Sequence, residues 1–174
     1  MPEVESALPF TVDGFQQLLD RRGDPDWVVE ARREAWAAFE AMEWPSRTSE
    51  EWMRTDLRLF HLDRFQLDAG EEPPETPPSV LNQGVDVGGQ AVSWNGATHS
   101  EWVSEDLAAK GVVFCSLNRA VQEHSELVRP YLMNRAFESR YDRFAALHAA
   151  WWNSGSFLYV PVSYTHLRAH ETRF

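Results

Sequence analysis

The sequence predicts an α+β protein in which helices come first and strands follow. Apolar residues between Val12 and Met42 recur at helical spacing, and a proline- and acid-rich stretch then interrupts the chain at residues 69–79. Beyond it come short apolar runs at residues 80–81, 85–87, 90–94, 112–115 and 156–160, several of them bounded by glycine. We therefore expect a helical N-terminal region over residues 1–68, a linker over 69–79, and a strand and helix module over 80–161.

Composition narrows the class of protein. The chain has 174 residues, 43% of them hydrophobic, which is enough for a modest core, and its formal net charge is −11. This charge disfavours nucleic acid and anionic membranes as partners, because both require a basic surface. No apolar run approaches the roughly 18 residues that span a bilayer, the first ten residues do not follow a secretory pattern, and Cys115 is the single cysteine. We expect a cytoplasmic protein.

Two helices are predicted near the N-terminus. Thr11 is a suitable cap for the first, and Gly23 is suited to end it. Asp24 is expected to cap the second helix, with Pro25 at its first position. The second helix carries an apolar stripe made of Val28, Ala31, Ala35, Ala38, Phe39 and Met42. It ends before Pro45, because the residue before a proline disfavours helical geometry.

The middle of the chain contains a capping pattern and a turn. Thr48 and Glu51 stand three residues apart and predict a short helix running toward Asp56. After the linker, the pair Asn95-Gly96 predicts a tight hairpin turn.

The stretch from Asp106 to Pro161 organises the second half. Residues 112–115 read as a strand buried on both faces. Three helices follow, with Ser116, Ser125 and Asp142 as predicted caps, and Pro130 limits the second of them. The helix after Asp142 is expected to place Phe144, Leu147, His148 and Trp151 on one face, and Asn153-Ser154-Gly155 then turns the chain into the strand SFLYV.

Three segments carry a family resemblance. They read DPDWVVEARREAWAAFEAMEWPSRTSEEWMRTDL, GVVFCSLNRAVQEHSELVRPYL and FAALHAAWWNSGSFLYVP. In composition and spacing they resemble the SufB/SufD family of iron–sulfur cluster assembly proteins over roughly residues 15–161. The first segment looks more like SufD than SufB, because of its P-x-R-x-x-E-E-W-x-x-T-D-L arrangement.

The resemblance implies a fold and a set of partners. It implies a helical N-terminal domain followed by the first strands of a truncated right-handed parallel β-helix. The implied function is that of a non-catalytic, SufD-like scaffold subunit of the SUF system, in a SufBCD complex with SufB and the ATPase SufC. The iron–sulfur cluster and the ATP bound by SufC belong to the full complex, and no cofactor is expected on this chain. The cluster-building positions and the SufC-docking helices lie farther along in the family.

The last residues depart from the family pattern. After Pro161 the chain reads VSYTHLRAHETRF, without the alternation expected of further β-helix turns. We expect residues 162–174 to be a non-native tail and the chain to be an N-terminal fragment.

No catalytic, cofactor-binding or metal-binding residue is assigned. His166 and His170 are four apart with Glu171 nearby, but this spacing alone is a weak metal signal, and the HExxH pattern is absent from the sequence. Cys115 lies within VVFCSL and is expected to be a small buried side chain, and His148 an interior or boundary residue. No phosphate-binding GxxxxGK[ST], GxSxG or CxxC pattern occurs, so we expect no enzyme activity.

One alternative comes from a different functional class. Trp94, Trp102, Trp151 and Trp152 would form an aromatic platform for a sugar or a peptide if their rings were exposed together. The sequence alone leaves both readings open.

Overall fold

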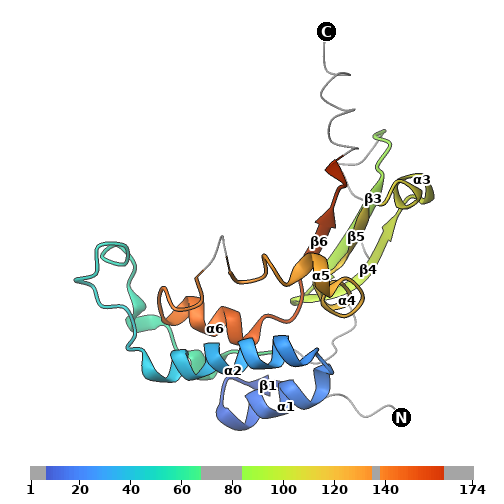
Figure 1. The fold of residues 1–174 in the computed structure, drawn as a ribbon. Coiled ribbons are helices and arrows are strands. Elements are labelled where there is room, and N and C mark those ends of the chain that lie inside the picture. Colours follow the sequence, from blue (N-terminus) through green and yellow to red (C-terminus); the bar gives the residue numbers. More distant parts are fainter. Residues whose placement is uncertain (1–6, 68–83, 135–137, 163–174) are drawn as a thin grey trace, which may run out of the picture. The chain divides into compact units, whose positions relative to one another are not determined.

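A computed structural model of the chain describes residues 7–67, 84–134 and 138–162. The chain forms two compact units (Figure 1). The first contains residues 1–71 and 128–153, and the second contains residues 72–127 and 154–174. Among the described residues, no helix has the length and apolarity needed to cross a bilayer.

The first unit is mainly helical. Its elements are β1 (Leu8–Pro9), α1 (Val12–Arg22), α2 (Asp26–Ala41), the 3-10 turns η1 (Leu57–Leu59) and η2 (Leu62–Arg64), β2 (Gln66–Leu67) and α6 (Arg143–Trp151). The two short strands β1 and β2 pair antiparallel. Helices α2 and α6 pack against each other (Figure 1).

Helix α1 confirms its predicted ends. The Thr11 side chain accepts a hydrogen bond from the Gly14 amide at 3.1 Å. At the other end Gly23 has φ 58°, a left-handed conformation that glycine adopts without a steric penalty. Phe15 and Leu18 are buried. Residues next to the helix in sequence therefore determine where it begins and ends.

Helix α2 begins one residue later than predicted, and its cap was assigned wrongly. Its N-cap is Pro25 and makes no side-chain hydrogen bond. Asp24 accepts instead from the Arg22 and Arg32 guanidinium groups, both at 2.9 Å. This carboxylate therefore neutralises buried cations rather than capping amides.

The buried face of α2 also differs from the predicted stripe. Ala31 is exposed, whereas Arg32 and Trp36 are buried. The full buried set is Val28, Arg32, Ala35, Trp36 and Phe39. The opposite side of the helix is polar, since Glu30, Arg33, Glu34 and Glu40 are exposed.

Aromatic rings fill the core of the first unit. Trp36 stacks on Phe15 with ring centroids 5.0 Å apart and on Phe39 at 4.9 Å. Trp151 from α6 meets Trp36 edge-on at 5.9 Å. Ala146, Ala149 and Ala150 complete the α6 side, and their small side chains allow α6 to lie close to α2.

A charged cluster lies beside this core. The Arg32 guanidinium donates to the carbonyl oxygens of Ala150 at 2.8 Å and Trp152 at 2.9 Å, and Arg22 donates to the Asn153 carbonyl at 2.8 Å. The Arg32 guanidinium also lies 4.1 Å from the centroid of the Trp152 ring. Burial, and then the nearby Arg22 charge, lower the pKa of Arg32 to about 10. One carboxylate, Asp24, therefore serves two buried cations.

The predicted capping box over residues 48–56 is wrong. Residues 47–54 form successive turns with backbone bonds such as Trp52 N to Ser49 O at 3.0 Å. Thr48 pairs with the Ser46 hydroxyl, and Glu51 accepts from the Tyr141 hydroxyl at 2.8 Å. A local partner therefore engages Thr48 and a distant one engages Glu51, so neither side chain caps a helix.

The second unit contains most of the strands. Its elements are β3 (Gly89–Trp94), β4 (Ala97–Val103), α3 (Glu105–Ala109), β5 (Val113–Ser116), α4 (Leu117–Glu123) and β6 (Ser156–Tyr159), and α5 (Ser125–Val128) crosses from this unit to the first. Strands β3 and β4 form the predicted hairpin, with Asn95 at φ 45° and Gly96 at φ 77°. These angles match a two-residue turn of the type that the pair favours.

The caps of the second half are confirmed in two of three cases. The Ser116 hydroxyl accepts from the Arg119 amide at 3.4 Å, and Asp142 accepts from the Ala145 amide at 2.7 Å. Ser125 instead donates to the Val121 carbonyl oxygen, and α5 ends at Val128, two residues before Pro130. The predicted strand is present as β5, but Val113 and Phe114 are only half-buried.

The grouping of segments differs from the division expected from sequence. The sequence predicts one module over residues 80–161, which includes α6, yet α6 belongs to the first unit because its alanine face packs on α2. The linker at 69–79 lies outside the described residues. Each described strand pair is antiparallel, so the parallel β-helix stays a prediction.

The charged cluster generates a stability prediction. Replacing Asp24 by Asn leaves Arg22 and Arg32 without their carboxylate, and we expect the free energy of unfolding of the first unit to fall by about 3 kcal/mol. Urea unfolding followed by far-UV circular dichroism measures this. The matched control is Asp56→Asn, whose partner Arg58 is 73% exposed, and we expect little change there. Equal effects of the two substitutions would contradict a structural role for the buried cluster.

Candidate functional site

The pair of strands β5 and β6 forms the candidate site. Phe114 lies opposite Leu158, and Cys115 lies opposite Phe157. Residues opposite each other in an antiparallel pair share a face, so Cys115 and Phe157 lie together on the more buried side. Leu158 is on the other face and is 61% exposed.

Strand β6 has an open edge. Of the strands that the structure describes, only β5 is hydrogen-bonded to β6. An open strand edge presents unpaired N–H and C=O groups that can pair with a further strand. The exposed apolar side chains of the second unit include Leu158, Tyr159 and Val162 on or next to β6. This edge, with Leu158 and Tyr159, is suited to extension of the sheet.

Side-chain and backbone contacts fix the end of the β5–β6 pair where Ser116 lies opposite Ser156. The Ser116 amide donates to the Glu101 carboxylate, and Arg119 lies 3.5 Å from the same carboxylate. The Leu117 amide donates to the Gly155 carbonyl at 2.7 Å, and the hydroxyls of Thr98 and Ser154 are 2.5 Å apart. These bonds hold the start of β6 against α4 and β4.

Cys115 is a buried side chain, as the sequence predicted. It is 2% exposed. Burial, reinforced by the nearby Glu101 charge, raises the pKa of the thiol. A thiol in this environment stays protonated and is a poor nucleophile and a poor metal ligand.

The remaining histidine and acidic candidates lie mostly outside the described residues. His166, His170 and Glu171 lie outside the described residues. His148 is on the exposed side of α6. The helix begins after its cap at Asp142, and from that start its alanines face α2 and His148 faces away. Within residues 7–67, 84–134 and 138–162, no group of three or more His, Cys, Asp or Glu side chains gathers in a way that would hold a metal ion.

The alternative reading, an aromatic platform of four tryptophans, fails for two of its four members. Trp151 and Trp152 are buried at 4% and 6% exposure, in the core and under the arginines of the first unit. Trp94 and Trp102 are exposed at 38% and 44% in the second unit. They lie at opposite ends of the β3–β4 hairpin, since Trp94 pairs with Ala97 and Trp102 with Gln90.

The sequence did not single out Glu101. A glutamate in the middle of a strand resembles any solvent-facing acid, and only the fold places it beside the Ser116 amide and Arg119. Glu101 is half-buried, whereas its neighbours Ser100 and Trp102 in the same strand are exposed. This burial accompanies its contacts with the Ser116 amide and Arg119.

The fold and the site define an α+β protein with a helical unit and a strand unit whose last described strand has an open edge. The family described as the SufBD protein N-terminal region matches residues 15–168. The chain belongs to this family. The match runs past Pro161, after which the sequence predicted a foreign tail; residues 163–174 lie outside the described residues.

Several curated relatives are similar over most of the chain. The chloroplastic iron–sulfur cluster assembly SufBD family protein ABCI8 of Arabidopsis thaliana is 28% identical over 91% of this chain and 32% of its own length. The iron–sulfur cluster assembly protein SufD of Bacillus subtilis is 26% identical over 84% of this chain and 34% of its own length. The SufBD family protein slr0074 of Synechocystis is 26% identical over 89% of this chain and 36% of its own length. The chain spans about a third of the length of these relatives.

The burial of Cys115 generates a prediction on its reactivity. We expect the native thiol to react with a chromogenic disulfide reagent near pH 8 at least about a hundredfold more slowly than in urea. Because its pKa is raised in the folded state, the unfolded chain loses the thiol proton first as the pH rises. Its contribution to stability is therefore complete below the ordinary thiol pKa and declines above it. Cys115→Ser controls for background absorbance, and native and unfolded rates within a few-fold of each other would contradict the burial.

Proposed function

We propose that this chain acts in iron–sulfur cluster assembly as a SufD-like, non-catalytic scaffold subunit of the SUF system. The observation that carries the proposal is the SufBD family match over residues 15–168. The similarity to SufD of Bacillus subtilis and the P-x-R-x-x-E-E-W-x-x-T-D-L segment favour the SufD branch.

The geometry of β6 supports a scaffold role. A strand with one paired edge and one open edge, next to exposed Leu158 and Tyr159, is what the first turn of a larger sheet requires. We propose that this sheet continues as a right-handed parallel β-helix. In that arrangement the helices of the second unit cover one end of the stack and protect its terminal strands.

The partners and cofactors follow from the same proposal. SufB and the ATPase SufC are the proposed partners, in a SufBCD complex. The cluster is the product of the complex and ATP is bound by SufC, so this chain contributes a surface rather than a reaction. The proposed location is the cytoplasm.

A chimera tests the proposal. Residues 1–161 of this chain are joined to the C-terminal part of Bacillus subtilis SufD that follows the matched region. The chimera is then expressed in cells depleted of their own SufD. We expect it to restore the activity of an iron–sulfur reporter enzyme, because the N-terminal region only has to begin the stack. Native SufD is the positive control.

A second chimera distinguishes the two branches of the family. The same residues are joined to the corresponding part of SufB and expressed in cells depleted of SufB. Rescue by this chimera and not by the SufD chimera would contradict the SufD-like role. A SufD chimera that is folded and monodisperse, yet leaves the reporter at the depleted level, would contradict the proposal as a whole.

A further inference from the structure

A cleft opens on the first unit between α2, α6 and the described residues Leu132, Met133 and Ser139 that precede α6. Its volume is about 130 Å³. It is lined by Trp27, Val28, Ala31, Arg32, Glu34, Leu132, Met133, Ser139, Ala149 and Trp152. The cleft is slightly smaller than the apolar cavity of about 150 Å³ that holds benzene, so it has room for one leucine side chain.

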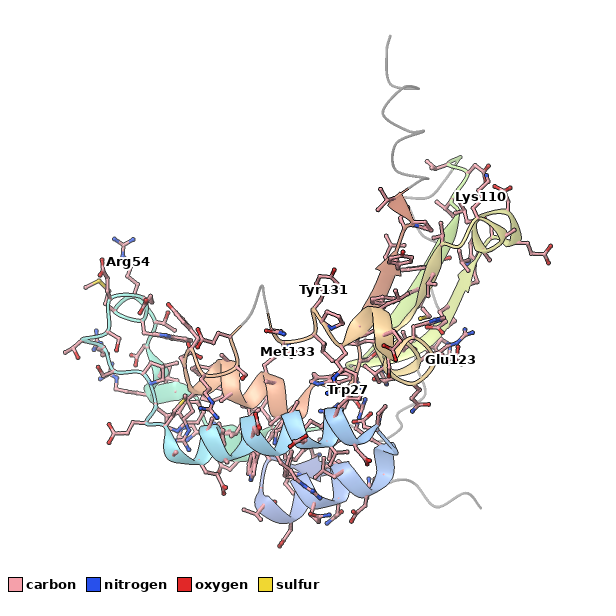
Figure 2. The ribbon with its side chains drawn as sticks, viewed as in Figure 1. Trp27, Arg54, Lys110, Glu123, Tyr131 and Met133 are labelled. Carbon is pink, nitrogen blue, oxygen red and sulfur yellow. The ribbon has the colours of Figure 1, made fainter. Side chains whose placement is uncertain are left out.

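The wall of the cleft contains an unusual backbone conformation. Met133 has φ 49°, in the left-handed region that residues with a side chain seldom adopt. Figure 2 labels Met133 on the connection and Trp27 on α2, two walls that come from separate segments of the chain. Such backbone strain occurs more often at binding sites than elsewhere.

An acidic strip runs along α2 next to the cleft. Asp26, Glu30 and Glu34 are four residues apart, so they follow one another along the helix surface. They line a second hollow with Val29 and Arg33, and Glu34 lines both hollows. No ion pair between described residues engages these three carboxylates. The cleft and the strip thus form one continuous surface, which we call the α2 cleft and strip.

We propose that the α2 cleft and strip bind a basic amphipathic segment of a partner protein. One leucine of that segment fills the cleft, and lysines or arginines spaced four apart lie along Asp26, Glu30 and Glu34. An apolar anchor in a pocket supplies most of the affinity of such contacts, and complementary charges set orientation and association rate. The net charge of −11 further favours a basic partner. This inference concerns a partner of the helical unit and does not depend on the proposed scaffold role.

The direct test uses the full chain and a defined probe. The probe is a fluorescently labelled peptide of about 14 residues, or four helical turns, with one central leucine and lysines spaced four apart. We expect saturable binding by fluorescence anisotropy, with NMR shifts at the indole N–H signals of Trp27 and Trp152. Binding should weaken as salt is added. A peptide in which glutamates replace the lysines should not bind.

Variants of α2 separate the two parts of the surface. Ala31 is exposed and lines the cleft, so Ala31→Phe fills the cleft with little effect on the core, and we expect affinity to fall at least about tenfold. Glu30→Gln should weaken binding and reduce its salt dependence. The matched control is Glu40→Gln, an exposed glutamate on the same helix that lines neither hollow, and it should leave the affinity unchanged.

Several results would overturn the proposal. Absence of saturable binding would do so, as would equal losses from Glu30→Gln and Glu40→Gln, which indicate attraction to overall charge alone. Concentration-dependent dimerisation of the wild-type chain that Ala31→Phe abolishes would identify a second copy as the occupant instead. Peptide binding is the readout throughout, so its failure is distinct from failure of the SUF chimera.

Discussion

The buried guanidinium of Arg32 is the contact on which the first unit depends. It joins the α1–α2 corner, through Asp24, to the carbonyl oxygens of Ala150 and Trp152 at the end of α6. These carbonyls have no partner within their own helix, because the last turn of any helix leaves its acceptors unpaired. Arg32 satisfies them and at the same time fixes the point where the chain leaves α6 for β6.

The two units differ in how much core they contain. The first has stacked aromatic rings, a close α2–α6 contact and a buried charge cluster. Among its described residues the second has few buried ones, including Val112, Cys115, Ala120 and Val121, and the outer edge of β6 is not paired with another described strand. A sheet with a small core gains stability when more strands are added to it. This contrast agrees with a role in which the helical unit is self-contained and the strand unit starts a larger structure.

The surface of α2 shows how one helix can serve two purposes. Its inner side, with Trp36 and Phe39, packs the core, and its outer side carries the acidic strip. Trp27 and Ala31 lie between these sides and line the cleft. A helix that is already fixed by core packing presents its remaining side chains in a defined arrangement, which lowers the entropic cost of binding a partner.

Sequence alone determined the features that depend on neighbouring residues. The helix ends and the hairpin turn depend on hydrogen bonds and backbone angles within a few positions, so the residue types there predict them. These residues are Thr11, Gly23, Ser116, Asp142 and the pair Asn95-Gly96. The motif spacing also indicated the SufB/SufD family. Only the tertiary structure decided that Asp24 pairs with Arg32 rather than caps α2, that Glu51 bonds Tyr141, and that α6 belongs with the first helices. The reason is physical: burying the Arg32 guanidinium without a counter-charge is costly, so Asp24 pairs with it, whereas Glu51 and Tyr141 are 90 positions apart in sequence and meet only in the fold.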